Sequence, residues 1–142
     1  MGCCSFETQN PNVTVCTNYV IQYNSFAGND SPMMFQCPSA NNVKVHANVG
    51  SFQSCSTGTW TYNVMQWSSR PSSCDGTNRW VSGPNWSDSA LGYVDSANAD
   101  FHLLPTSPAL DAGDPVVFPL TDIDGDGRPL GGAPDAGANE AG

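Results

Sequence analysis

Short segments rich in β-branched and aromatic residues alternate with turn-rich stretches along the first half of the chain. Such segments are typical of β-strands. In one of them Trp60, Tyr62 and Val64 alternate with Thr61, Asn63 and Met65, so one set should face the core and the other should face water. We predict strands at residues 12–16, 19–23, 33–36, 43–47 and 59–66.

The predicted strands recur at irregular intervals. Residues 17–24 align with residues 41–48 at a spacing of 24, which places Ile21 over Val45. Irregular periods of this size indicate a solenoid, and short strands at this period favour a parallel β-helix over helical repeats or propeller blades. The adjoining steps are 20, from residues 4–6 to 24–26, and 15, from residues 47–49 to 62–64.

An asparagine follows two of the predicted strands, at Asn24 and Asn48, and the step of 15 residues places Asn63 at the equivalent position of the next coil. Asparagine tolerates a left-handed bend, and its amide can bond to the asparagine one coil away. We therefore predict a ladder of stacked asparagines. The alternative is that they are ordinary turn residues in a β-sandwich.

The composition favours an all-β fold of one domain. The chain has 142 residues, with 14 Gly and 11 Pro and few of the residues that stabilise helices. Thirteen acids against four bases give a net charge of -9, and the bases are scattered. Nucleic-acid binding needs clustered Lys and Arg, so it is not expected. No apolar run approaches the ~18 residues of a membrane-spanning helix.

Six cysteines in a chain with scarcely any Lys or Glu indicate an oxidising compartment, where disulfides persist. We expect a secreted or cell-surface protein. The cysteines do not form the Cys-x-x-Cys pairs of zinc sites, and His46 and His102 are isolated, so both histidines are expected to be packing or surface residues. The spacings leave many pairings open, and we take Cys55 with Cys74 as the first candidate disulfide.

The C-terminal third contains three motifs that resemble one protein family. The motifs are DFHLLPTSPALDAGDP at residues 100–115, TDIDGDGRP at 121–129 and GAPDAGA at 132–138. They resemble the C-terminal end of secreted bacterial right-handed parallel β-helix proteins of the pectin-lyase-like superfamily. The resemblance implies β-helix coils over residues 1–97 and an irregular, loop-rich, acidic cap over residues 98–142, packed on the last coil.

The N-terminal end has no comparable cap. Residues 1–6 read as the end of a coil already under way, whereas a bare strand edge invites pairing with another chain. We expect either the C-terminal portion of a longer solenoid or a homo-oligomer that covers the uncapped N-terminal coil.

The acidic segment contains a candidate calcium site. Asp122, Asp124 and Asp126 occupy positions 1, 3 and 5 of a loop with Gly127 at position 6, which is the first half of a calcium-binding loop. The bidentate acid of an EF-hand is missing. The alternative is a solvated acidic turn in which Arg128 folds back as an ion pair.

Flat aromatic side chains can bind sugars, and Trp67, Trp80 and Trp86 lie in Ser- and Gly-rich surroundings where they could project as a platform. Their alternative role is packing in the core. The expected partner is a polysaccharide or cell-surface glycan.

Catalytic residues are not identified by the sequence. The resemblance implies polysaccharide lyases and hydrolases as relatives, and hydrolases need two carboxylates. No acid cluster accompanies Lys44, Arg70 or Arg79 on the coils. The carboxylates in the later loops are Asp75, Asp88, Asp95 and Asp100.

Three functions are consistent with these features. The first is an extracellular β-helix module that binds polysaccharide or serves as a surface scaffold. The second is a polysaccharide lyase or glycoside hydrolase of the pectin-lyase-like type. The third is a self-associating structural solenoid.

Overall fold

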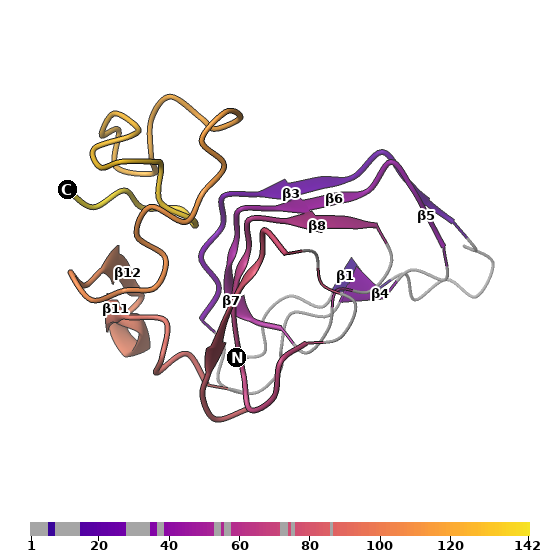
Figure 1. Ribbon diagram of the computed structural model, residues 1–142, viewed down its shortest axis with the longest axis horizontal. Helices are drawn as coiled ribbons and strands as arrows, with labels where there is room; N and C mark the ends of the chain where they lie inside the picture. The colour runs from indigo at the N-terminus through magenta and orange to yellow at the C-terminus, as the bar shows by residue number, and fades with distance from the viewer. Residues whose placement is uncertain are drawn as a thin grey trace.

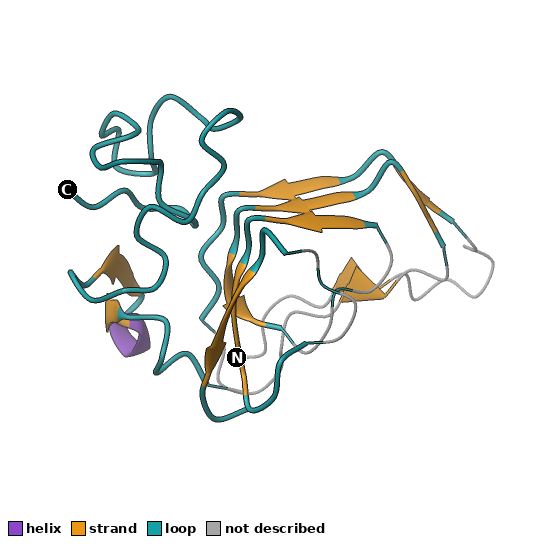
Figure 2. Ribbon diagram, in the orientation of Figure 1, coloured by secondary structure: helices purple, strands orange, loops and turns teal. Residues whose placement is uncertain are grey.

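The computed structural model describes residues 6–7, 15–27, 35–36, 39–52, 55, 58–71, 74, 76–85 and 87–142. Within this part the protein is all-β, and its one helical element is the short 3-10 helix η1 (Ser96–Asn98) (Figure 2). The strands are β1 (Phe6–Glu7), β2 (Cys16–Thr17), β3 (Val20–Gln22), β4 (Phe35–Gln36), β5 (Ala40–Asn41), β6 (Lys44–His46), β7 (Val49–Ser51), β8 (Thr59–Thr61), β9 (Val64–Trp67), β10 (Arg79–Ser82), β11 (Tyr93–Asp95) and β12 (Asp100–Leu103).

Two parallel three-stranded sheets form the centre of the fold. One has the order β3-β6-β8 and the other β7-β9-β10, and they meet at an angle in Figure 1. Ile21 pairs with Val45, which pairs with Trp60. These pairs confirm the predicted steps of 24 and 15. The predicted step of 20 is wrong, because β1 pairs with β4 at Phe6 and Phe35 instead of lying over residues 24–26.

The chain therefore stacks in layers, which we define as layer 1 (residues 15–27), layer 2 (39–52), layer 3 (58–67) and layer 4 (76–82). The corner between the two sheets is made by one left-handed residue in each of the first three layers. These residues are Tyr23, Ala47 and Tyr62, with φ of 51°, 52° and 58°. A single left-handed residue turns the chain sharply, which a continuous strand cannot do.

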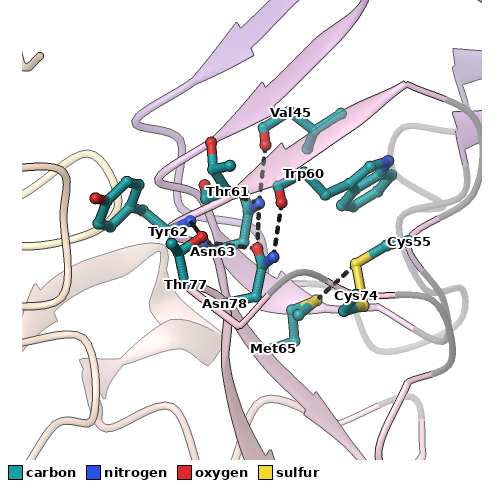
Figure 3. The surroundings of a disulfide bond; sticks show 10 residues. All are labelled: Val45, Cys55, Trp60, Thr61, Tyr62, Asn63, Met65, Cys74, Thr77 and Asn78. Carbon is teal, nitrogen blue, oxygen red and sulfur yellow. Dashed lines mark hydrogen bonds between the residues drawn. A yellow bond between two sulfur atoms is a disulfide. The ribbon is translucent and has the colours of Figure 1, made fainter.

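The residue after each corner is an asparagine, and these side chains form the predicted ladder. Asn48 donates its backbone N–H and its Nδ2 to Asn63 Oδ1, both at 3.0 Å. Asn63 repeats the pattern with Asn78 Oδ1 at 3.1 and 2.8 Å, as Figure 3 shows for the last step. Asn48 and Asn63 are fully buried. The ladder confirms the prediction for Asn24, Asn48 and Asn63 and extends it to Asn78.

The predicted strand at residues 59–66 is broken at its centre. Tyr62 turns the corner, and β8 and β9 lie in different sheets on either side of it. Trp60 and Val64 are buried as predicted, but Met65 is also buried. The simple alternation fails because both faces of β9 are covered.

Two hydrophobic clusters explain this burial. The first fills the space between the sheets and contains Cys16, Ile21, Val43, Val45, Phe52, Cys55, Trp60 and Met65. The second joins β7 and β9 to the C-terminal segment through Val49, Val64, Leu91, Tyr93, Leu103, Ala109, Ala112 and Ala136. The C-terminal segment thus covers the outer face of the second sheet.

The C-terminal segment follows the corner of the stack. Asp114 N–H donates to Tyr23 Oη in layer 1 at 3.2 Å, and Gly137 N–H donates to Ala47 O in layer 2 at 2.8 Å. Gly137 has φ of 95°, and an added Cβ would lie 2.7 Å from Ser25 Oγ. The segment expected to cap the last coil therefore lies along the side of layers 1 and 2 as well (Figure 1).

Cys55 and Cys74 form the disulfide predicted from the sequence, with a Cα–Cα distance of 5.0 Å. Figure 3 places it beside Met65, to the right of Asn78, and the Cys55 sulfur lies 3.9 Å from Met65 Sδ. Cys16 is also disulfide-bonded. The other cysteines lie outside the described residues, as does most of the segment 1–14 on which the open first coil was predicted.

Replacing Asn63 with alanine should lower the free energy of unfolding by about 3 kcal/mol, because buried donors and acceptors on Asn48, Asn78 and Val45 lose their partner. Denaturant unfolding measures the change. The control is Asn98→Ala, since Asn98 is exposed and bonds only Asp95; we expect a change within about 0.5 kcal/mol. Equal losses in the two variants would contradict a structural role for the ladder.

Candidate functional site

The candidate site lies between β12 and the hairpin at residues 121–127. Ala99 precedes β12 in the left-handed conformation, with φ of 63°. This residue ends η1 and lets β12 pair antiparallel with β11. Phe101 packs edge-on against Tyr93, with ring centroids 5.5 Å apart, whereas Asp100 and His102 alternate with it along the strand and share the other face.

His102 lies between two carboxylates. Its Nδ1 is 2.5 Å from Asp100 Oδ1, and its Nε2 is 3.2 Å from Asp124 Oδ2. Both nitrogens of an imidazolium are donors, so one protonated ring satisfies both carboxylates. The arrangement joins β12 to the hairpin. All three side chains are substantially exposed, His102 by 58%, which makes them available to a ligand.

The hairpin is held in shape by Asp122. Its Oδ1 accepts the backbone N–H groups of Asp124 and Asp126, both at 2.9 Å. Its Oδ2 accepts the N–H of Glu140 at 2.9 Å and the Asn139 amide at 3.3 Å. Both oxygens of Asp122 therefore serve the backbone and its neighbours.

A cavity of about 200 Å³ opens beside this cluster. The side chain of Asn139 is buried and donates to Asp124 Oδ2 at 3.2 Å, so it holds the carboxylate at the cavity wall. The lining mixes apolar with polar groups and consists of Ala99, Phe101, His102, Ile123, Asp124, Ala138 and Asn139. Convergent polar groups around an apolar floor are typical of small-molecule sites.

The hydrogen bond between Asp100 and His102 shifts both groups. It lowers the pKa of Asp100 below its usual range and raises the pKa of His102 above its usual value, with the negative charges of Asp100 and Asp124 adding to the latter. Because the pKa of His102 is raised, the ion pairs are fully formed at pH values where the carboxylates are ionised and the imidazole is still protonated. They are lost as the pH rises through the pKa of folded His102.

Arg128 forms its ion pair with Glu140 and not with a carboxylate of the acidic loop that precedes it. Its side chain is buried, 3.3 Å from Glu140 Oε2, with Nη1 donating to Asp135 O and Nη2 to Gly137 O. The guanidinium also lies over the Tyr23 ring, 5.1 Å from its centroid. The predicted ion pair between Arg128 and the acidic turn is therefore wrong, because the cation binds the C-terminal end of the segment.

His46 has a structural position. Its ring packs edge-on between Tyr23 and Tyr62, its Nδ1 lies 2.8 Å from Thr61 Oγ1, and its Nε2 lies 3.5 Å from Asp114 Oδ2. Burial raises the pKa of Tyr23 to about 12. This column fastens the C-terminal segment to the stack, which agrees with the packing role predicted for His46.

The predicted aromatic platform is not assembled from Trp67 and Trp80. Trp67 is 9% exposed, so its ring is withheld from solvent. Trp80 is 36% exposed at the end of the second sheet, and its Nε1 donates to Trp67 O at 3.2 Å. Trp86 lies outside the described residues. Of the two tryptophans that the structure describes among these three, Trp80 keeps the exposure that stacking on a sugar needs.

Of the four carboxylates considered for catalysis, Asp100 lies in the site. Asp95 accepts a hydrogen bond from Asn98, and Asp75 lies outside the described residues. His102 was taken for a packing or surface residue, and the structure gives it two charged partners. The signal was the spacing of Asp100 and His102, because residues two apart on a strand share a face.

Among the described residues, no group of three or more His, Cys, Asp or Glu side chains is arranged to hold a metal ion. No helix in that part of the chain is long and apolar enough to cross a membrane. The chain matches no protein family model, no curated protein and no solved structure.

NMR titration of His102 tests the ion-pair cluster. Replacing Asp100 with asparagine removes the main group that raises the histidine pKa, so the pKa of His102 should fall towards its ordinary value. Asp126→Asn removes one negative charge from the same hairpin without a contact to the ring, and it should leave the titration almost unchanged. A His102 pKa equally insensitive to both changes would contradict the pairing.

Calcium binding by Asp122, Asp124 and Asp126 stays a prediction, and its measurement is the melting temperature with calcium and with EDTA. Because both oxygens of Asp122 already accept N–H donors, we expect about 1 mM calcium to raise the melting temperature by less than about 2 °C. A larger rise that Asp124→Asn abolishes would establish the metal site.

Proposed function

We propose that this chain is a secreted or cell-surface right-handed parallel β-helix protein, and that it binds polysaccharide at the pocket between β12 and the 121–127 hairpin. Support for the β-helix comes from parallel strands stacked in register at steps of 24 and 15 residues and from the asparagine ladder. The resemblance of residues 100–138 to the pectin-lyase-like superfamily points the same way, and the disulfides suit an oxidising compartment.

The chemistry of the pocket is the observation that carries saccharide binding. A sugar ring presents C–H patches together with hydroxyl groups that both donate and accept hydrogen bonds. Phe101 and Ile123 offer apolar surface, and Asp124 offers a charged acceptor beside His102. Asp124 is held by Asn139 and so is placed before a ligand arrives, which reduces the entropy lost on binding.

A polysaccharide lyase or glycoside hydrolase is the second candidate. The observation that favours it is the Asp100–His102 pair, in which a carboxylate orients an imidazole at the pocket wall whose other nitrogen lies 3.2 Å from Asp124 Oδ2. Above its raised pKa, His102 could act as a general base towards a bound substrate. Asp124 would be the second carboxylate in a hydrolytic reaction.

The test is retention and cleavage of neutral and acidic polysaccharides by the purified chain, with and without calcium. Asp124→Asn should weaken retention about tenfold or more, because a ligand hydroxyl loses its charged acceptor. The matched control is Asp95→Asn, which removes one exposed carboxylate outside the pocket lining. Trp80→Ala tests the remaining aromatic position separately.

Retention that the two aspartate variants weaken equally would contradict a site at the pocket. Cleavage of a polysaccharide that disappears in His102→Asn and persists in Asp95→Asn would make the enzyme the primary function. If no polysaccharide in the panel is retained or cleaved, the scaffold function remains. The third candidate, self-association, is measured separately by sedimentation at increasing protein concentration.

A further inference from the structure

Asn24 is the open end of the asparagine ladder. Each later member of the ladder accepts two donors from the layer before it, as Asn48 Oδ1 does from the N–H and Nδ2 of Asn24 at 3.0 and 2.9 Å. Within the described part of the chain, no donor reaches Asn24 Oδ1. The Oδ1 atom of Asn24 in layer 1 is therefore an open acceptor, whereas the asparagine Oδ1 of each following layer accepts two hydrogen bonds.

The donor side of the ladder is also incomplete at this end. Asn48 Nδ2 donates to Ile21 O in the layer before it at 3.0 Å, and Asn63 Nδ2 donates to Val45 O at 2.9 Å. Asn24 Nδ2 donates to Gln22 O in its own layer at 2.8 Å, as Asn63 Nδ2 also does to Thr61 O at 3.1 Å, but within the described residues it reaches no carbonyl of a preceding layer. Asn24 thus lacks both contacts that a preceding layer would supply.

The edge of β3 beside Asn24 is unpaired in the described residues, since β3 pairs only with β6. Lys44 N–H donates to Tyr19 O, and Tyr23 N–H donates to His46 O. Backbone N–H and C=O groups point to alternate sides along a strand. The N–H and C=O groups of Val20 and Gln22 therefore point away from β6. The free edge is apolar as well as unpaired, with Val20 57% and Tyr19 52% exposed.

This edge has no charge to discourage pairing. Layer 1, residues 15–27, contains no Asp, Glu, Lys or Arg, although the chain as a whole carries a net charge of -9. Exposed edge strands are ordinarily protected by charged side chains, proline or bulges. An uncharged edge with an open asparagine acceptor is suited to being covered by polypeptide.

We infer that the β3 edge of layer 1 binds one further β-layer of the chain's own repeat type: a parallel strand followed by a left-handed corner residue and an asparagine. The asparagine of the added layer donates its N–H and Nδ2 to Asn24 Oδ1. Asn24 Nδ2 gains a carbonyl of the added strand as an acceptor, as Asn63 Nδ2 has Val45 O. The interface continues the one that already joins layers 1 to 4, and it does not depend on saccharide binding.

A peptide of residues 40–52 supplies such a layer, because it contains β6, the corner residue Ala47, Asn48 and β7. We expect the peptide to bind the full chain and to slow hydrogen exchange at the amides of Val20 and Gln22. Replacing Asn48 by alanine in the peptide should weaken binding about tenfold, because the side-chain hydrogen bond from its Nδ2 to Asn24 Oδ1 is lost while the backbone N–H remains. This peptide variant keeps the same charge and leaves the protein untouched, so misfolding cannot explain the loss.

Asn24→Ala in the chain should weaken peptide binding by a similar factor, and Asn98→Ala, an exposed asparagine elsewhere, should not. Absence of binding at millimolar peptide would overturn the inference. So would binding that is indifferent to Asn48 in the peptide, exchange protection away from β3, or a chain dimer that covers β3 equally well in Asn24→Ala. None of these outcomes bears on retention of polysaccharide at the pocket.

Discussion

The stacking of one corner upon another is the constraint on which the rest of this structure depends. At each corner a left-handed residue turns the chain between the two sheets, and the asparagine after it bonds to its counterpart in the next layer. The hydrogen bonds hold the layers in register at a point where the backbone ladder is interrupted. Once the corners coincide, the inner side chains of successive layers must also coincide, and Ile21, Val45 and Trp60 meet in the core.

The C-terminal segment completes this arrangement from the outside. Two sheets at an angle enclose only their inner faces, so the outer face of β7 and β9 would remain exposed. Leu91, Leu103 and Ala136 cover it, while Arg128, buried against Glu140, fastens the end of the chain near Tyr23. The same segment brings the acidic hairpin next to β12, and the pocket exists only because of that contact.

The repeat and its ladder were predictable because they depend on local chemistry repeated along the chain. The spacings of Asn24, Asn48 and Asn63 are visible in the sequence. In the structure each donates its N–H and its Nδ2 to the asparagine of the next layer. The corner at Tyr62 was not predictable from alternation, because a tyrosine in the middle of an apolar run gives no sign of a left-handed bend. Residues 64–67 are buried on both faces because the C-terminal segment, which begins more than twenty residues further along the chain, covers the outer face.

The sequence by itself determined the all-β class and the layer steps of 24 and 15 residues, and it made Cys55 with Cys74 the first candidate disulfide. These features follow from the types and spacings of residues that act on their near neighbours in the stack. Only the tertiary structure decided that Trp67 is buried, that Arg128 pairs with Glu140, and that His102 stands between Asp100 and Asp124. Each of these depends on where an irregular segment lies against the sheets, and an irregular segment has no period from which its position could be calculated.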